Sequence, residues 1–290
     1  MSDGMETSRL DQAYSYCTDL VRDCDKDRYL ASLFAPAARR KHLFALYAFN
    51  QEVARIRDLV SSPMPGEMRL QWWRDTLAGI GHGDVQAHPV AAAIIDTVSV
   101  CGLPVKPLYD LIEARAFDLY DDPMPTLLDL EGYCGETSSA LIQLAALILA
   151  DGRDPGTAEV SGHGGVAYAI TGLLRALPFH AARAQVYVPA EVLSRHGLTP
   201  DDVLKREPTA ALRAALADLR DLARRHLTMT RALIPTVAPA LAPAFLPIAL
   251  VEPHLDRMDR PTYDPFRTRI EIPQWQRQWI LWCQARKARG

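Results

Sequence analysis

Apolar residues recur every three or four positions along nearly the whole chain, and this spacing restricts the fold more than any other feature. In segment 37–61 the apolar stripe consists of Leu46, Phe49, Val53, Ile56 and Val60. Such spacing is typical of a helix that buries one face. No stretch alternates apolar and polar residues over the length of a strand, which argues against a βαβ layout. The sequence therefore predicts an all-α fold.

Glycine and proline breaks divide the chain into the expected helices. These cover residues 11–25, 37–61, 67–80, 89–101, 104–120, 126–150, 157–177, 193–198, 209–233, 241–258 and 273–289. Pro178 is expected to end or kink the helix before it, because a proline disfavours the helical conformation of the preceding residue. We find no internal repeat and no linker long enough to separate domains. We therefore expect a peripheral N-terminal helix in residues 1–27 and a single helical domain in residues 28–290.

Composition excludes several classes of protein. The chain has 290 residues, of which 49% are hydrophobic, and this is enough to build a full core. Its net charge of −3 provides no basic field for nucleic acid. The five cysteines are scattered and include no CxxC pair, which indicates a reducing compartment and argues against a zinc site.

Two segments raise the question of membrane contact. Residues 232–251 carry no charge, but prolines interrupt them at every fourth position, and lipid cannot replace the helical hydrogen bonds that are lost. We expect a loop and a buried or membrane-touching helix there, not a span. Trp275, Trp279 and Trp282 have helical spacing near the C-terminus. Core packing and an interfacial aromatic belt both remain open for these three residues.

Two helix faces are candidates for a site. On the helix of segment 37–61, Tyr47, Asn50, Ala54 and Asp58 share a face beside the apolar stripe. On the helix before Pro178, a line of tiny side chains runs beside the core stripe. It consists of Gly165, Ala169, Gly172 and Ala176. Such a line either lets another helix approach closely or leaves room for an elongated apolar ligand.

Two further motifs resemble sites but have simpler explanations. Asp118, Asp121 and Asp122 form an acidic cluster, but Pro123 follows it directly, so we expect a solvated helix end. The glycine-rich stretch 162–165 lacks the Lys-Ser/Thr that follows in a phosphate-binding loop.

At this point two segments carry a resemblance. FALYAFNQEVARIRD (44–58) and TGLLRALPFHAARAQVYVP (171–189) resemble the two signature segments of the squalene/phytoene synthase family. LQWWRDTLAG (70–79) and the pair Tyr133-Cys134 are also similar to landmarks of that family. The resemblance extends from about Arg28 to the C-terminal helices. It implies a single-domain isoprenoid synthase fold with a central cavity, in enzymes that join two prenyl diphosphates head to head with magnesium.

The metal-binding motifs of that family are not preserved here. Its Asp-Asp-x-x-Asp pattern falls on residues 54–58, where only Asp58 matches, and its Asp-x-x-x-Asp pattern falls on residues 176–180, where neither acid is present. Aspartates hold Mg²⁺, and the metal neutralises the leaving diphosphate. Loss of one preorganised electrostatic group lowers a rate by about 10²–10³. Several losses at one site predict that metal-assisted ionisation does not occur there.

The departures resemble a degenerate branch of the same family, which includes the synthase-like assembly factor of respiratory complex I. That resemblance implies a non-catalytic protein that acts at the membrane during assembly of the complex. The matching positions are Ala48, Phe49, Asn50, Glu52, Asp58, Leu174, Arg175, Ala176, Pro178 and His180.

The balance of charge at the two motifs has moved from acidic to basic. Such a pocket can bind a phosphate or an anionic headgroup without metal, although the arginines can equally be solvated or paired with local acids. The candidate ligand- or anion-binding residues are Arg28, Tyr47, Asn50, Arg55, Asp58, Arg175, His180, Arg183 and Tyr187. The candidate cavity lining is Ala54, Gly165, Ala169, Gly172 and Ala176.

Three hypotheses follow. In the first, the protein is non-catalytic, needs no cofactor, and binds a prenyl or lipid-like molecule, a respiratory-complex subunit, or both. It is then cytoplasmic or peripheral on the inner membrane, on the matrix side if mitochondrial. In the second, it is an active prenyltransferase that holds Mg²⁺ through unexpected acids, with Asp58, Glu136 and Asp118 as candidates. In the third, it is a structural helical adaptor with a filled cavity.

Overall fold

The computed structural model describes residues 2–81 and 83–288, and its description of side chains begins at Arg9. No strand occurs in this part of the chain, so the prediction of an all-α fold is confirmed. Met1 and residues 289–290, at the ends of the two predicted units, lie outside the described residues. The α-helices are α1 (Ser2–Cys24), α2 (Lys26–Ser32), α3 (Ala37–Ala54), α4 (Pro63–Leu77), α5 (Pro89–Cys101), α6 (Lys106–Ala116), α7 (Leu127–Cys134), α8 (Ala140–Leu149), α9 (Ala158–Ala181), α10 (Ala190–Arg195), α11 (Pro200–Leu204), α12 (Ala210–Leu233), α13 (Ala242–Phe245), α14 (Val251–Met258) and α15 (Gln274–Lys287).

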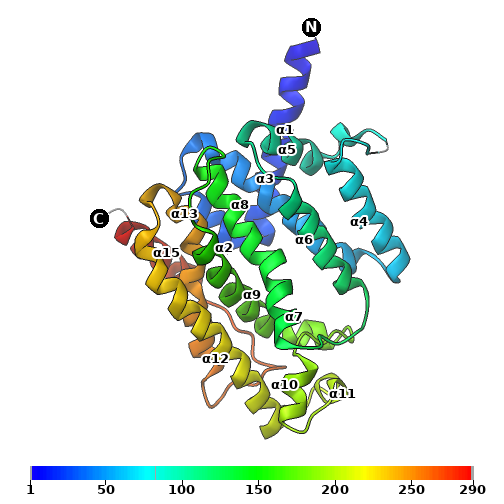
Figure 1. Ribbon diagram of the computed structural model, residues 1–290, viewed down its shortest axis with the longest axis vertical. Coiled ribbons are helices and arrows are strands. Elements are labelled where there is room, and N and C mark those ends of the chain that lie inside the picture. The colour runs from blue at the N-terminus through cyan, green and yellow to red at the C-terminus, as the bar shows by residue number, and fades with distance from the viewer. Residues whose placement is uncertain (1, 82, 289–290) are drawn as a thin grey trace.

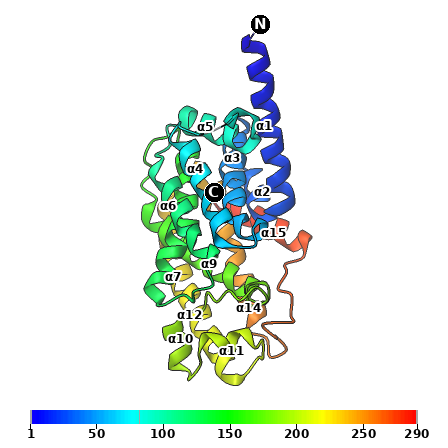
Figure 2. The same cartoon turned by 90° about the vertical axis from the view of Figure 1, so that its right-hand side faces the viewer.

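The long helix α9 lies in the middle of the bundle (Figures 1 and 2). It packs against α7, α8, α12 and α14, while α3 packs mainly against α1, α5 and α8. The spacing of apolar residues predicts a core stripe of Val166, Ile170, Leu173 and Leu177 on α9. Three of these four residues are at most 7% exposed, and Leu173 is half-buried. The helical spacing of the sequence therefore identifies the buried face of this central element correctly.

The N-terminal part of α1 projects beyond the other helices, whereas its C-terminal half belongs to the main core (Figure 2). Cys17 and Val21 are fully buried, and the Tyr14 hydroxyl lies 3.0 Å from Nδ1 of His42 on α3. The sequence predicts a peripheral helix over residues 1–27. The half of α1 that packs on α3 and α5 instead shares its core with the rest of the chain, because its apolar face needs those two helices as a cover.

Two predicted helices are shorter than expected. The helix over 37–61 ends at Ala54 and continues as a 3₁₀ turn, Ile56–Leu59, since Val60 is extended and the chain turns into α4 at Pro63. The helix over 241–258 is divided into the 3₁₀ turn Pro239–Leu241, α13, the 3₁₀ turn Leu246–Leu250 and α14. Here the repeated prolines remove the N–H donors of a continuous helix.

Two further details of the helices differ from expectation. The helix predicted over 126–150 contains a π-helical turn, Gly135–Ser139, between α7 and α8. Pro178 does not end α9, which continues to Ala181. The proline lies in the last turn, where it removes only one hydrogen bond, and the Pro178 carbonyl still accepts from the Ala182 N–H at 3.2 Å.

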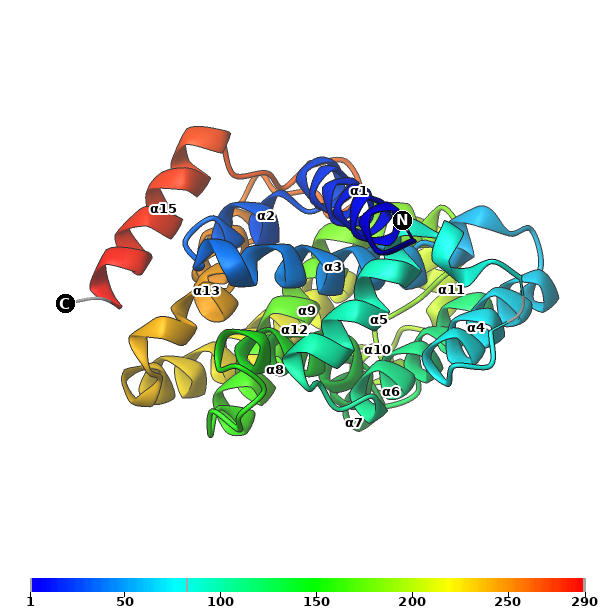
Figure 3. The ribbon, with the colours of Figure 1, turned by 90° about the horizontal axis from the view of Figure 1, so that it is seen from above.

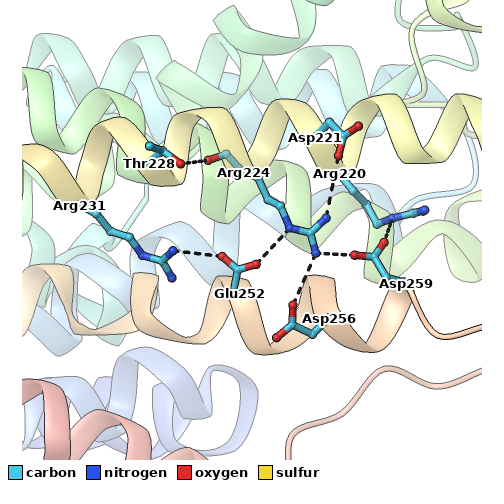
Figure 4. Close-up of polar contacts among 8 residues, drawn as sticks. All are labelled: Arg220, Asp221, Arg224, Thr228, Arg231, Glu252, Asp256 and Asp259. Carbon is cyan, nitrogen blue, oxygen red and sulfur yellow. Dashed lines mark hydrogen bonds and ion pairs between the residues drawn. The ribbon is translucent and has the colours of Figure 1, made fainter.

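An ion-pair network joins α12 to α14 (Figure 4). Arg224 donates from Nε to Glu252 Oε1 at 3.0 Å and from Nη2 to Asp259 Oδ2 at 2.5 Å. Arg220 donates to the other oxygen of Asp259 at 2.7 Å, and Arg231 reaches the second oxygen of Glu252 at 3.2 Å. The Arg224 side chain is 28% exposed, so its pairs are less screened than ordinary surface pairs.

We expect Arg224→Ala to lower the free energy of unfolding by about 1–2 kcal/mol, because it removes several charge-assisted hydrogen bonds at once. Urea unfolding followed by circular dichroism measures the change. The exposed neighbour Arg225 supplies the control, Arg225→Ala, with an expected change within about 0.5 kcal/mol. The effect of Arg224→Ala should also shrink in 1 M salt. Equal effects of the two substitutions would show that the network does not stabilise the helix pair.

The helices of the bundle are amphipathic or short. Within residues 2–81 and 83–288, no helix combines the length and the apolarity that a bilayer span requires.

Candidate functional site

The line of small residues on α9 divides into two parts with different surroundings. A Cβ added at Gly165 would lie 2.3 Å from the backbone Cα of Ser139, so this glycine lets the π-helical turn approach α9 closely. A Cβ added at Gly172 would meet nothing within 4 Å, and the neighbouring Ala169 and Ala176 are partly exposed. Gly165 therefore does not belong to the predicted cavity lining, whereas the stretch around Gly172 borders open space.

The second predicted face, on α3, carries the polar pair and the small residue. Tyr47 and Asn50 are 3% and 5% exposed, while Ala54 is half-buried. The Asn50 Oδ1 atom is buried without a hydrogen-bond partner among the described residues. A buried amide oxygen in this state is unfavourable unless a water or a ligand satisfies it. Asn50 is thus a polar group that a bound molecule would stabilise.

Arg28 joins α2 to both of these helices. Its guanidinium lies 5.5 Å from the ring centre of Tyr47 on α3 and 5.0 Å from that of Tyr168 on α9. It also pairs with Asp25 Oδ2 at 2.8 Å, and this carboxylate raises the arginine pKa against the opposing effect of burial. Burial raises the pKa of Tyr47 and Tyr168, so both phenols stay neutral. We call these four residues, Asp25, Arg28, Tyr47 and Tyr168, the Arg28 clamp.

Arg175 shares a face of α9 with Tyr168 and Gly172, since the three residues are spaced by four and three. The Arg175 Nε lies 3.4 Å from the carbonyl oxygen of Ile270.

Asp27 on α2 is a buried acid in the same region. Burial and the neighbouring Asp25 raise the pKa of Asp27, while Arg277, Arg175 and Arg28 oppose that rise. Arg277 Nε lies 2.6 Å from Asp27 Oδ1, close enough for an ion pair although the N–H does not point at the oxygen.

His254 on α14 is a second buried polar group in this region. Burial, and then Arg175, Arg257 and Arg277, lower its pKa to about 3, so it is neutral at ordinary pH. Both of its ring nitrogens lack a hydrogen-bond partner among the described residues. His254 is thus an unpaired neutral group close enough to feel the charge of Arg175, which follows Gly172 by three residues.

The remaining predicted cations are engaged with acids. Arg183 pairs with Asp58, which links the C-terminal end of α9 to the 3₁₀ turn after α3. Arg55 pairs with Glu52 at 3.3 Å, and both pairs include an exposed arginine side chain. Of the two alternatives for Arg55 and Arg183, pairing with local acids is the one observed.

His180 and Tyr187 lie elsewhere, in a buried polar cluster around Asp118. The Tyr187 hydroxyl donates to Asp118 Oδ1 at 2.6 Å, and the His180 ring lies 4.5 Å from the Tyr187 ring. Tyr133 donates to the same carboxylate at 2.9 Å, and Arg115 donates to its other oxygen at 3.0 Å. We call Arg115, Asp118, Tyr133 and Tyr187 the Asp118 cluster.

The sequence expectation for Asp118 is therefore wrong. The run Asp118, Asp121 and Asp122 was predicted to be a solvated helix end, yet Asp118 is only 6% exposed. It lies in the 3₁₀ turn Phe117–Leu119, which directs its side chain inward, while Asp121 and Asp122 are exposed. Burial lowers the pKa of His180 to about 4, so that ring stays neutral beside the cluster.

Comparison with known proteins shows the family of this chain. A model of the squalene/phytoene synthase family matches residues 21–276. The chain belongs to this family. The solved squalene synthase HpnC from Alicyclobacillus acidocaldarius is 27% identical, with a TM-score of 0.73 over 89% of this chain and 97% of that one. The prediction of an isoprenoid synthase fold is confirmed.

The curated relatives of this chain include proteins of two kinds. The human NADH dehydrogenase (ubiquinone) complex I assembly factor 6 is 32% identical over 88% of this chain and 77% of its own length. The phytoene synthase of Arthrospira platensis is 26% identical over 93% and 91% of the two chains. The resemblance to the assembly-factor branch that the sequence predicts is confirmed.

The residues at the family's metal motifs do not fit a magnesium cluster. Positions 54, 55 and 57 hold Ala, Arg and Arg, and the one remaining acid, Asp58, pairs with Arg183. Among the side chains that the structure describes, in residues 9–81 and 83–288, no three His, Cys, Asp or Glu residues are arranged to hold a metal ion. Asp118, another acid considered for this role, is held by Arg115 and two tyrosines. We derive no catalytic step through magnesium.

Several residues of the site were not singled out from the sequence. Tyr168 could have been found most easily from the sequence. It lies one turn before Gly172 and therefore on the same face of α9 as the small residues. Asp25 caps α2 by accepting the Arg28 N–H at 3.0 Å, which a search for helix caps would have found. His254 and Arg277 reach the site from distant parts of the chain, and no local pattern marks them.

Proposed function

We propose that this chain is a non-catalytic member of the squalene/phytoene synthase family that supports the assembly of respiratory complex I. The observation that carries the proposal is its 32% identity to human complex I assembly factor 6 over 88% of the chain. The engaged state of Asp58 supports the absence of synthase activity, because this carboxylate already has a guanidinium partner. In this proposal the protein needs no cofactor and acts near the membrane, on the matrix side if it is mitochondrial.

The proposal includes a ligand with an anionic group and an apolar tail, a partner protein, or both. Gly172 borders the open space, and Arg175, three residues later on α9, is the arginine that follows it most closely in the sequence. The tail would follow Ala169, Gly172 and Ala176, while the unpartnered Asn50 oxygen and the His254 nitrogens offer polar contacts. Binding through arginine and neutral polar groups requires no metal.

Deletion of the gene in its own organism tests the assembly role. We expect the amount and the NADH:ubiquinone activity of complex I to fall, while succinate dehydrogenase, measured in the same membranes, stays unchanged. A plasmid copy of the gene should restore complex I. Normal complex I in the deletion strain would refute the proposed role.

Purified protein tests the ligand and the lack of catalysis. Native mass spectrometry is expected to detect a co-purifying lipid, and Gly172→Leu should abolish its retention by filling the open space beside that residue. Incubation with farnesyl or geranylgeranyl diphosphate and Mg²⁺ should release no diphosphate.

The alternative function is head-to-head prenyl transfer. It is favoured by the 27% identity to the squalene synthase HpnC, which is not far below the identity to the assembly factor. Diphosphate release that depends on Mg²⁺ and is abolished by Asp58→Ala would establish this alternative and overturn our proposal.

A further inference from the structure

The C-terminal helix α15 presents three tryptophans to solvent. Trp275, Trp279 and Trp282 are 71%, 59% and 41% exposed. Their spacing of four and three places them on one face, and the rings of Trp279 and Trp282 stack with centroids 5.2 Å apart. Of the two alternatives that the sequence leaves open for these residues, core packing does not occur. We call this side of α15 the tryptophan face.

The tryptophan face also carries positive charge. Arg286 follows Trp282 by four residues and lies on the same side of the helix, with its guanidinium 5.0 Å from the Trp282 ring centre. Lys287 is exposed next to it, and α15 contains no acidic residue. An anion is therefore the complementary partner for the C-terminal end of this face.

An uncharged segment continues the surface beside α15. Residues 232–251 carry no charged side chain, and residues 235–240 are exposed except for a half-buried Val237. A groove of about 300 Å³ has Ile234 and Trp279 in its walls, and a second, of about 220 Å³, has Pro239 and Ala285. Both grooves thus lie between α15 and the uncharged segment, and together they form one largely apolar surface. The helix α15 itself lies at the rim of the bundle (Figure 3).

We propose that the tryptophan face of α15 seats the protein on an anionic lipid membrane. Tryptophan rings favour the headgroup region of a bilayer, where the apolar ring is buried and the indole N–H stays hydrated. Arg286 and Lys287 meet the lipid phosphates, and the uncharged segment 232–240 lies against the same surface. The structure thus assigns the membrane contact to one helix and gives the protein a fixed orientation on the bilayer.

The composition of the surface favours lipid over a protein partner. A protein interface normally has a polar rim that supplies specific hydrogen bonds. Here the rim on the side of residues 232–240 offers no charged side chain, and the charges on the other side are all of one sign. An anionic bilayer matches this pattern without requiring a shaped partner.

This inference deepens the proposed membrane location, but it stands on α15 and its neighbours alone. Normal complex I in a deletion strain would refute the assembly role and leave the membrane contact intact. Conversely, failure of the protein to bind vesicles would refute the contact without bearing on complex I assembly.

Co-sedimentation of the full chain with vesicles tests the proposal. The vesicles contain either phosphatidylcholine alone or phosphatidylcholine with cardiolipin. We expect binding to the anionic vesicles that weakens with salt, a blue shift of tryptophan emission, and quenching of that emission by brominated lipid. The triple variant Trp275→Gln, Trp279→Gln, Trp282→Gln should lower the partition coefficient by about 100-fold, given the apolar area it removes.

A matched triple variant removes exposed apolar side chains from other helices. Met64, Met68 and Leu128 are 75%, 69% and 77% exposed and belong to α4 and α7, apart from α15 (Figure 3). Their replacement by Gln should change vesicle binding by less than about twofold, because these residues lie off the proposed contact. Arg286→Ala should weaken binding to the anionic vesicles by about fivefold and should not affect the neutral ones.

Two results would overturn the proposal. One is the absence of binding to anionic vesicles by the wild-type chain, which would also be the outcome if the tryptophan face served only a protein partner or a second copy. The other is an equal loss of binding in the two triple variants. Because the three tryptophans are exposed, the variant should retain the wild-type unfolding midpoint, and circular dichroism verifies that it is folded.

Discussion

Replacement of Asp118 with alanine is expected to lower the free energy of unfolding by about 3–5 kcal/mol, because it leaves a buried charge on Arg115 without its carboxylate. Asp118 accepts hydrogen bonds from Arg115 at 3.0 Å, Tyr133 at 2.9 Å and Tyr187 at 2.6 Å. These donors come from α6, α7 and the segment after α9, so one side chain joins three parts of the fold. Urea unfolding of the purified protein, followed by far-ultraviolet circular dichroism, measures the change.

Asp122 provides the control, since it belongs to the same acidic run but is exposed. Asp122→Ala should change the free energy of unfolding by less than about 0.5 kcal/mol. If Asp118→Ala does not fold, Tyr187→Phe removes a single donor from the cluster and should cost about 1–2 kcal/mol. Equal and small effects of Asp118→Ala and Asp122→Ala would mean that the carboxylate is solvated, as the sequence alone predicts.

The contrast between these two aspartates shows where sequence reasoning reaches its limit. Periodicity locates the helices and the buried face of α9, because every turn of an amphipathic helix repeats the same information. The direction of the Asp118 side chain depends instead on the single 3₁₀ turn Phe117–Leu119 and on two tyrosines, one of them 69 residues away in the sequence. Such a cluster has no local sequence pattern. The proline that follows, Pro123, makes a solvated helix end the simpler prediction for this acidic run.

The candidate site also combines features that periodicity predicts with features that depend on tertiary contacts. The spacing of Tyr47 and Asn50 on α3 and of Ala169, Gly172 and Ala176 on α9 identified two faces, and these are the faces that carry partly exposed small residues. The Arg28 clamp was missed as a unit because it joins α2, α3 and α9, whose relative placement no periodicity encodes. The departures from the family motifs were readable in advance, since they required only the residue types.

Under the proposed non-catalytic function, the pattern of ion pairs accounts for how a synthase fold stays stable without a bound metal. Arginines gathered in and beside the two motif segments would repel one another without partners. In this chain Arg55 pairs with Glu52, Arg57 with Asp121 at 3.3 Å, and Arg183 with Asp58. Each of these three arginines thus has an acid partner from a nearby segment of the chain. The ends of α3 and α9 are held together by side chains, in a place where the family's aspartates would require a divalent ion.

A second large change in stability is expected on α9, where Gly165 and Gly172 have different surroundings. Gly165→Ala is expected to lower the free energy of unfolding by about 2–3 kcal/mol. Its Cβ would lie 2.3 Å from the Ser139 Cα and 2.4 Å from the Ser139 nitrogen, and backbone atoms cannot rotate away. The Ser139 hydroxyl also donates to the Gly162 carbonyl at 2.8 Å, so the π-helical turn is fixed against α9 at two points.

Gly172→Ala is the matched substitution on the same helix, seven residues further on. It should stabilise the protein by about 0.5–1 kcal/mol, because alanine is the better helix former and the added methyl meets nothing within 4 Å. The two changes are chemically identical and lie in one helix, so a difference in sign between them reports only their surroundings. Urea unfolding of both variants under the same conditions provides the measurement. If Gly172→Ala destabilised the protein as much as Gly165→Ala, the space beside Gly172 would be filled, and the adaptor with a filled cavity would replace the ligand-binding proposal.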